Sequence, residues 1–204
     1  MPSKTRLVYV SSDHVFGGDG AYDEESPPCP ISVYGATRVA AERLVLNREG
    51  SLVVRVGLPI GPSPNGRTGH MDWLRYRLQR HLPVTIVNDE YRSVVWAGDL
   101  AHRLMQLAAS DETGICHVTA SRAVSRVDLA NYLLSQSGGN VGFACESRCQ
   151  RAAPHLGWVE LATIYRGKLF DPLTCVLDTP GAFGSRYRDP GYGARAAVLP
   201  WMSE

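Results

Sequence analysis

The sequence lacks an excess of charge of either sign, and it lacks any long hydrophobic run. Its 21 lysines and arginines face 20 acidic residues, which leaves a formal net charge of +1 and excludes the strongly basic surface typical of nucleic-acid-binding proteins. No apolar stretch approaches the roughly 20 residues that span a bilayer, and Leu7–Val10 is too short for the core of a signal peptide. We therefore expect a cytoplasmic protein of about one domain that binds neither nucleic acid nor membrane.

Metal-binding patterns are also missing. The five cysteines are an odd number at no metal-like spacing, and no histidine follows Cys145 and Cys149 at zinc-finger distance. The six histidines are scattered along the sequence, which favours separate structural positions over a shared ligand site. We expect reduced thiols and no metal ion.

Short apolar runs alternate with segments of helical periodicity up to about residue 140. Strands are predicted at 6–10, 52–56, 84–87, 93–96 and 115–118, and helices at 32–47, 72–81, 99–109 and 125–135. Asp99 is predicted to cap one helix, Ser125 and Asp128 form a capping box for another, and 57–69 reads as a loop. The pattern predicts an α/β chain with a largely parallel sheet over residues 1–140, followed by an irregular region over 141–204.

Three polar residues in the first forty are candidates for chemistry. Ser12 follows the first strand, and the carboxyl ends of parallel strands are where open α/β sheets bind ligands. Tyr34 and Arg38 lie four apart on one face of a predicted helix, so both can contact one bound molecule. A tyrosine has a pKa near 10, and a neighbouring cation stabilises its phenolate, which suits it to general acid–base work.

Four stretches carry a resemblance to a known family. Val10-Ser-Ser-Asp-His-Val-Phe-Gly17 and Tyr34-x-x-x-Arg38 resemble the second half of an extended short-chain dehydrogenase/reductase, in the branch of the dTDP-4-dehydrorhamnose reductases. Val54-Arg-Val-Gly-Leu-Pro-Ile-Gly-Pro62 and Arg92-Ser-Val-Val-Trp-Ala-Gly-Asp-Leu-Ala101 are similar to later segments of the same family, in the same order. The resemblance implies a Rossmann-like fold over residues 6 to about 140.

The resemblance also implies roles for single residues. Tyr34 would be the proton donor or acceptor, Ser12 would bind the reacting oxygen, and Asp13 would assist as an accessory polar group. Arg38 would hold the nicotinamide ribose, while Ser11, Gly57 and Leu58 would lie at the cofactor, and Arg92 would lie at the substrate. The implied cofactor is NADPH or NADH, and the implied substrate is a nucleotide-linked sugar.

Two features depart from the family pattern. The sequence contains no Gly-x-Gly-x-x-Gly or Gly-x-x-Gly-x-x-Gly fingerprint, so the match begins at about the family's fourth strand. The strand at 7–10 is then expected to have one open edge, to be filled by an upstream segment, by a second copy or by a partner chain, unless the fold has degenerated. Arg38 stands where the family has a compact lysine ammonium.

Simpler interpretations of these residues, and other functions, also fit the sequence. Ser12 could merely end a strand, Tyr34 could be an amphipathic residue at a helix start, and Arg38 could pair with Glu42 one turn on. One functional hypothesis is a reductase or epimerase. The alternatives are a non-catalytic relative, such as the regulatory beta subunit of methionine adenosyltransferase, or an inactive truncated fragment.

Overall fold

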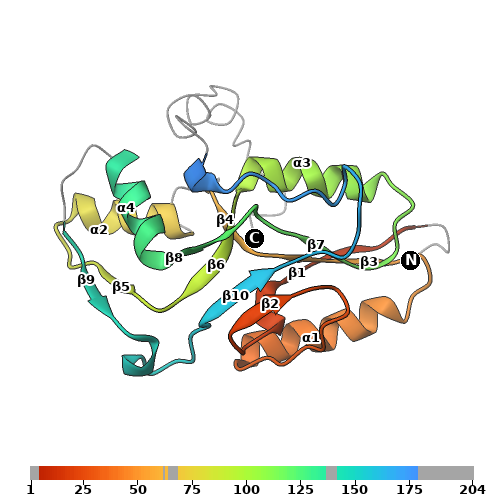
Figure 1. The fold of residues 1–204 in the computed structure, drawn as a ribbon, viewed down its shortest axis with the longest axis horizontal. Coiled ribbons are helices and arrows are strands. Elements are labelled where there is room, and N and C mark those ends of the chain that lie inside the picture. Colours follow the sequence, from red (N-terminus) through yellow and green to blue (C-terminus); the bar gives the residue numbers. More distant parts are fainter. Residues whose placement is uncertain (1–4, 62, 64–68, 137–141, 179–204) are drawn as a thin grey trace, which may run out of the picture.

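The computed structural model describes residues 5–61, 63, 69–136 and 142–178 (Figure 1). Its strands are β1 (Val8–Ser12), β2 (Gly20–Tyr22), β3 (Leu52–Val56), β4 (Leu58–Ile60), β5 (Thr85–Val87), β6 (Tyr91–Trp96), β7 (Gly114–Val118), β8 (Ala123–Ser125), β9 (Ala144–Glu146) and β10 (Trp158–Leu161). Its α-helices are α1 (Val33–Leu46), α2 (His70–Gln79), α3 (Ala97–Ala108) and α4 (Arg126–Gln136). Three short 3-10 turns are η1 (Asp13–Val15), η2 (Arg148–Gln150) and η3 (Val176–Asp178).

A parallel sheet of β1, β3 and β7 lies between two helices. β3 pairs with β1 on one side and β7 on the other, and all five of its residues are buried. Figure 1 shows α3 over one face of this sheet and α1 over the other. Val54 belongs to the core cluster that contains Leu107 of α3, and α1 contributes Val39 to a second cluster. The predicted α/β architecture is therefore confirmed, with its central strand covered on both faces and both edges.

β1 lies at the edge of this sheet. Among the described residues it pairs with β3 alone, and Val10 keeps 41% of its surface exposed. β1 is thus an edge strand within the part of the chain that the structure describes. Unpaired strand edges are ready sites for pairing with another strand.

A second sheet takes in a strand that the sequence analysis missed. β10 pairs in parallel with both β2 and β6, and Val159 and Leu161 are buried in it. The expectation of irregular structure after residue 140 is therefore wrong for β9 and β10, while residues 179–204 lie outside the described residues. The expected loop at 57–69 likewise contains β4, which pairs with β6. The division of the chain at residue 140 stays a prediction.

The helix starts follow local capping chemistry. Ser32 caps α1 by accepting a hydrogen bond from the Gly35 N–H at 3.0 Å. The N-cap half of the capping box predicted for α4 is confirmed, because the Asp128 N–H donates to Ser125 Oγ at 2.9 Å; the Asp128 carboxylate accepts from the Ser125 hydroxyl. The prediction for Asp99 is wrong, because Trp96 occupies the N-cap of α3 and Asp99 lies in its first turn. None of the helices in the described ranges is both long and apolar enough to cross a membrane.

Gly35 lets the start of α1 approach η1 closely. A Cβ atom on Gly35 would lie 2.1 Å from the backbone oxygen of His14 and 2.9 Å from Pro30 Cβ. The first of these neighbours is backbone, which cannot move aside as the end of a side chain can. Glycine at this position therefore sets the distance between Tyr34 on α1 and the turn that follows β1.

We expect Gly35→Ala to destabilise the protein by about 2 kcal/mol, although alanine is the better helix former by about 1 kcal/mol. The overlap with the His14 carbonyl outweighs the gain in helix propensity, and α1 must shift away from η1. Urea unfolding followed by circular dichroism measures the loss. Gly98→Ala in α3 is the control, because a Cβ there meets only the Trp96 side chain, at 3.3 Å. Equal stability of the two variants would contradict this explanation.

Candidate active site at the end of β1 and the adjoining pocket

Ser12 and Asp13 lie where β1 ends. Ser12 accepts a hydrogen bond from the His14 N–H at 3.3 Å, which caps η1, and its hydroxyl donates to Asp13 Oδ1 at 3.1 Å. Asp13 is fully buried. The predicted placement at the carboxyl end of a parallel strand is confirmed, and η1 holds the Ser12 hydroxyl in one direction.

Tyr34 and Arg38 form a pair on one face of α1. The Arg38 guanidinium carbon lies 4.7 Å from the centre of the Tyr34 ring, and Arg38 Nη1 donates to the Tyr9 hydroxyl at 2.9 Å. Hydrogen bonds to Tyr9 and Tyr34 raise the pKa of Arg38. The cation beside Tyr34 is therefore permanent at any physiological pH. The alternative that Arg38 pairs with Glu42 is wrong, since that carboxylate is bound to Arg55.

His14 joins the two halves of this site. Its ring stands edge-on to Tyr34, with the ring centres 5.3 Å apart, and its Nε2 lies 3.4 Å from Arg92 Nη1. Burial and the nearby Arg92 lower the pKa of His14, so the ring is neutral and can accept from that guanidinium. In the sequence His14 is one of several scattered histidines, and no local pattern predicts its position here.

Arg92 is at the centre of a buried ion network formed by Asp13, Arg92, Glu90 and His155. Its guanidinium binds both carboxylate oxygens of Asp13, with Nε 2.6 Å from Oδ2, and its Nη1 donates to Glu90 Oε1 at 3.1 Å. Glu90 Oε2 in turn accepts from His155 Nδ1 at 3.2 Å. Arg92 is only 4% exposed and has a carboxylate on each side. The contact with a substrate expected for Arg92 stays a prediction, and this placement supports a positioning role.

The other predicted cofactor residues lie in the interior. Ser11 is buried, Leu58 is 8% exposed within the larger core cluster, and Gly57 packs so closely on β6 that a Cβ would lie 2.2 Å from the Ser93 carbonyl oxygen. The structure thus brings together Ser12, Asp13, Tyr34 and Arg38 through η1. The cofactor contacts expected of Ser11, Gly57 and Leu58 stay predictions.

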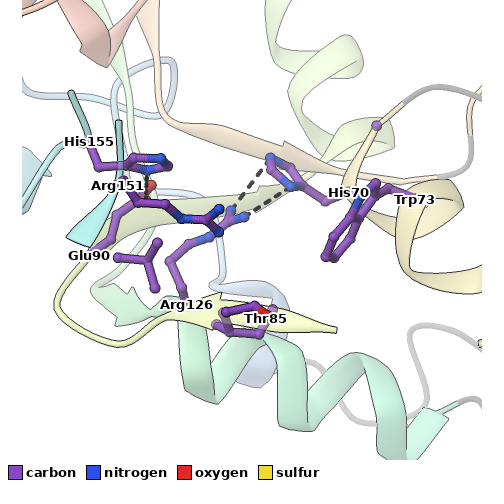
Figure 2. Close-up of a pocket in the computed structure, with 10 residues that line it drawn as sticks. His70, Trp73, Thr85, Glu90, Arg126, Arg151 and His155 are labelled. Carbon is purple, nitrogen blue, oxygen red and sulfur yellow. Dashed lines mark hydrogen bonds and ion pairs between the residues drawn. The ribbon is translucent and has the colours of Figure 1, made fainter. Parts of the chain in front are cut away.

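A cavity of about 360 Å³ adjoins the ion network (Figure 2). Its wall is formed by Gly69, His70, Trp73, Thr85, Ile86, Val87, Glu90, Arg126, Arg151 and His155. In Figure 2, Arg126 lies at the centre, with His70 and Trp73 on one side and Glu90, Arg151 and His155 on the other. The pocket therefore combines an exposed indole with two guanidinium groups.

Electrostatics make this cavity suited to an anion. Arg126 Nη2 lies 3.0 Å from His70 Nδ1, and burial together with Arg126 lowers the pKa of His70 to about 4. His70 is therefore neutral at pH 7 and accepts from Arg126. Arg151 is paired with Glu146, and within the described ranges Arg126 contacts the neutral His70 imidazole and no carboxylate. Such a partly buried guanidinium can bind a phosphate or carboxylate group.

The pocket is not predictable from the sequence, because its residues come from separate segments. The lining side chains come from helix α2, from β5 and the turn after it, from the start of α4 and from the connection to β10. No spacing along the chain relates these residues to one another. His14 and His155 are far apart in the sequence, but both lie near Glu90 in the fold.

Comparison with known proteins gives relatives over much of the chain. This chain is 30% identical over 145 residues to a dTDP-4-keto-6-deoxy-D-glucose reductase of Streptomyces niveus, and the alignment covers 67% of this chain and 48% of that protein. A shorter match, 49% identical over 57 residues, is to methionine adenosyltransferase 2 subunit beta of Xenopus tropicalis and covers 27% of this chain and 17% of that one. The chain spans about half the length of the curated reductases it matches.

The fold has close neighbours among solved structures. The dTDP-4-dehydrorhamnose reductase of Bacillus anthracis in complex with NADP aligns with a TM-score of 0.70 and 24% identity, over 83% of this chain and 61% of that one. This likeness confirms the expected Rossmann-like reductase fold. The model of the RmlD substrate binding domain matches residues 2–154, which is more than half of the sequence. The chain therefore belongs to the RmlD substrate-binding domain family.

Proposed function

We propose that this chain provides the substrate-binding and proton-transfer part of an NAD(P)-dependent reductase or epimerase that acts on a nucleotide-linked sugar. The observation that carries the proposal is the arrangement of Tyr34, Arg38 and Ser12 at the end of β1, connected through buried ion pairs to a cationic pocket. The names of the reductases it resembles support the same substrate class.

The residues present fit the reacting end of a nicotinamide cofactor. Tyr34 is 47% exposed, and its hydroxyl and the Arg38 guanidinium offer a donor pair of the kind that can hold ribose hydroxyls. When bound, NADPH or NADH would supply the hydride. The planar Arg38 fork replaces a compact ammonium and binds a ribose with different geometry.

The residues of the chain provide the proton and the orientation. Ser12 would contact the reacting sugar oxygen, and its hydroxyl proton, which is bonded to Asp13 Oδ1, would turn to that oxygen when the substrate binds. Tyr34 would exchange a proton with that oxygen, and the Arg38 cation stabilises the negative charge that develops on the phenol oxygen. Arg92 would position Asp13 and hence Ser12 without contacting the substrate itself.

The pocket would bind the nucleotide diphosphate of the substrate. Arg126 is the cation for its negative charge, with Arg151 and His155 nearby, and the 41% exposed Trp73 offers an aromatic face to a base. The cavity of about 360 Å³ is within the range of small-molecule sites.

A second candidate is a non-catalytic binding subunit. The 49% identity to methionine adenosyltransferase 2 subunit beta over 57 residues supports it, as does arginine in place of lysine at position 38. In this case the open edge of β1 would meet a second copy or a partner chain.

We expect calorimetric titration with dTDP and with NADPH or NADH to show binding to the folded chain. Arg126→Ala should weaken dTDP binding by about tenfold or more because it removes a partly buried cation from an anion site, while leaving the cofactor constant unchanged. Arg38→Ala should weaken the binding of the cofactor and leave the dTDP constant unchanged. The exposed Arg43→Ala is the control for both. Equal binding of dTDP by wild type and Arg126→Ala would contradict the assignment of the pocket as the nucleotide diphosphate site.

A further inference from the structure

Glu90 is the single carboxylate among the described residues that line the pocket. It is 6% exposed, and both of its oxygens are in use, one on Arg92 and the other on His155. Burial alone would raise the pKa of Glu90, but Arg126 and Arg92 outweigh burial and lower it. The carboxylate is therefore negatively charged, and the cation at the centre of the pocket acts on it.

A ligand phosphate would be drawn to the same cation. Arg126 lines the cavity, and its positive charge acts on Glu90. An anion that binds there is repelled by the Glu90 charge and must share the Arg126 cation with it. On its other side, Glu90 holds Arg92 against Asp13, next to Ser12.

We propose that Glu90 is a specificity-determining residue. Its buried negative charge repels the negatively charged group of a ligand in this pocket, while the same carboxylate fixes Arg92 on Asp13. The inference rests on the proposed function of the pocket as a nucleotide diphosphate site. It implies that a ligand needs more than one negative charge to bind well, because a weak anion competes poorly with a buried carboxylate that is already in place.

The test is the affinity of Glu90→Gln for three probes, measured by calorimetry. The amide oxygen can keep the contact with Arg92, and the side chain keeps its size, so the variant removes the charge with little change in packing. We expect dTDP and inorganic pyrophosphate to bind about tenfold more tightly, with the gain shrinking as salt screens the charges. Thymidine, which has no charge, should bind as in the wild type.

Asp89→Asn is the matched control. It removes the same charge from the neighbouring residue, but Asp89 is not among the lining residues and binds Arg148 and Ser147 instead. We expect less than about a twofold change in the dTDP constant, because this side chain is about two-fifths exposed and screened by solvent. If Glu90 only maintained the fold, Glu90→Gln would weaken the binding of charged and uncharged probes alike.

Circular dichroism establishes that each variant folds. Glu90→Asp is the second variant, since it keeps the charge but withdraws it from His155 by one methylene, and it should show a smaller gain in dTDP affinity. An unchanged or weaker dTDP constant in whichever variant folds, beside a wild type that binds dTDP, overturns the role of Glu90 alone. If neither wild type nor variants bind dTDP or pyrophosphate, the function proposed for the pocket fails as well.

Discussion

Replacing Glu42 by glutamine is expected to lower the free energy of unfolding by about 3 kcal/mol. Glu42 on α1 holds Arg55 of β3 with two hydrogen-bonded contacts, Arg55 Nη2 to Oε2 at 2.8 Å and Nε to Oε1 at 3.1 Å. Both side chains are almost completely buried, at 3% and 1% exposed. Glutamine removes the negative charge and leaves the Arg55 cation in the interior without a counter-ion.

The expected loss of stability is large because the Arg55 cation stays buried after its carboxylate partner is removed. Taking one charge from a buried pair typically destabilises by 3–5 kcal/mol, whereas replacing both with apolar residues of similar size is often neutral. Glu42→Leu combined with Arg55→Met should therefore be more stable than Glu42→Gln alone. This pair fastens α1, which carries Tyr34, to the central strand of the sheet.

Chemical denaturation followed by circular dichroism measures both variants. Glu49→Gln is the control, because this carboxylate lies just past the end of α1 and is exposed. We expect it to change stability by no more than about 0.5 kcal/mol. A loss of the same small size in Glu42→Gln would show that the buried pair contributes nothing to holding α1 on the sheet.

The second large effect is expected from Tyr34→Phe. If the chain takes part in reduction of a nucleotide-linked keto sugar, losing the phenol hydroxyl should lower kcat by a factor of about 10² to 10⁴. The ring, its edge contact with His14 and its stacking beneath Arg38 all persist in phenylalanine, so dTDP binding and stability should be unchanged. Consumption of NADPH with a dTDP-linked keto sugar gives the rate.

Tyr76→Phe is the matched control for this experiment. Tyr76 on α2 is also about half exposed, at 49%, and it has a similar neighbour, since Arg80 lies over its ring at 4.6 Å. Its removal should leave the rate unchanged. Full turnover in Tyr34→Phe would refute the role of Tyr34, and wild type that binds dTDP but turns over no keto sugar would favour the binding-subunit alternative.

Local sequence was sufficient for the elements whose cause is local. β3 follows from an unbroken apolar run, α1 from its helical spacing and the Ser32 cap, and α4 from the Ser125–Asp128 box. The pair of Tyr34 and Arg38 was also predictable, because residues four apart on a helix always share a face.

β10 shows where this reasoning stops. Its four residues, Trp158 to Leu161, follow a glycine and carry one acidic side chain, so the stretch reads as irregular. It becomes a strand because β2 and β6 supply hydrogen-bonding edges on its two sides. Short strands take their stability from such neighbours rather than from intrinsic preference.

The sequence by itself thus determined the α/β class, the resemblance to the reductase family and the candidates Ser12, Tyr34 and Arg38. Only the tertiary structure decided that Arg92 is buried between Asp13 and Glu90, that Glu42 binds Arg55 and not Arg38, and that a cationic pocket exists. The physical reason is the range of the interactions. Caps and periodicity act within a few residues, whereas Arg92 and Asp13 are 79 positions apart in the chain, and their ion pair depends on how the two sheets pack.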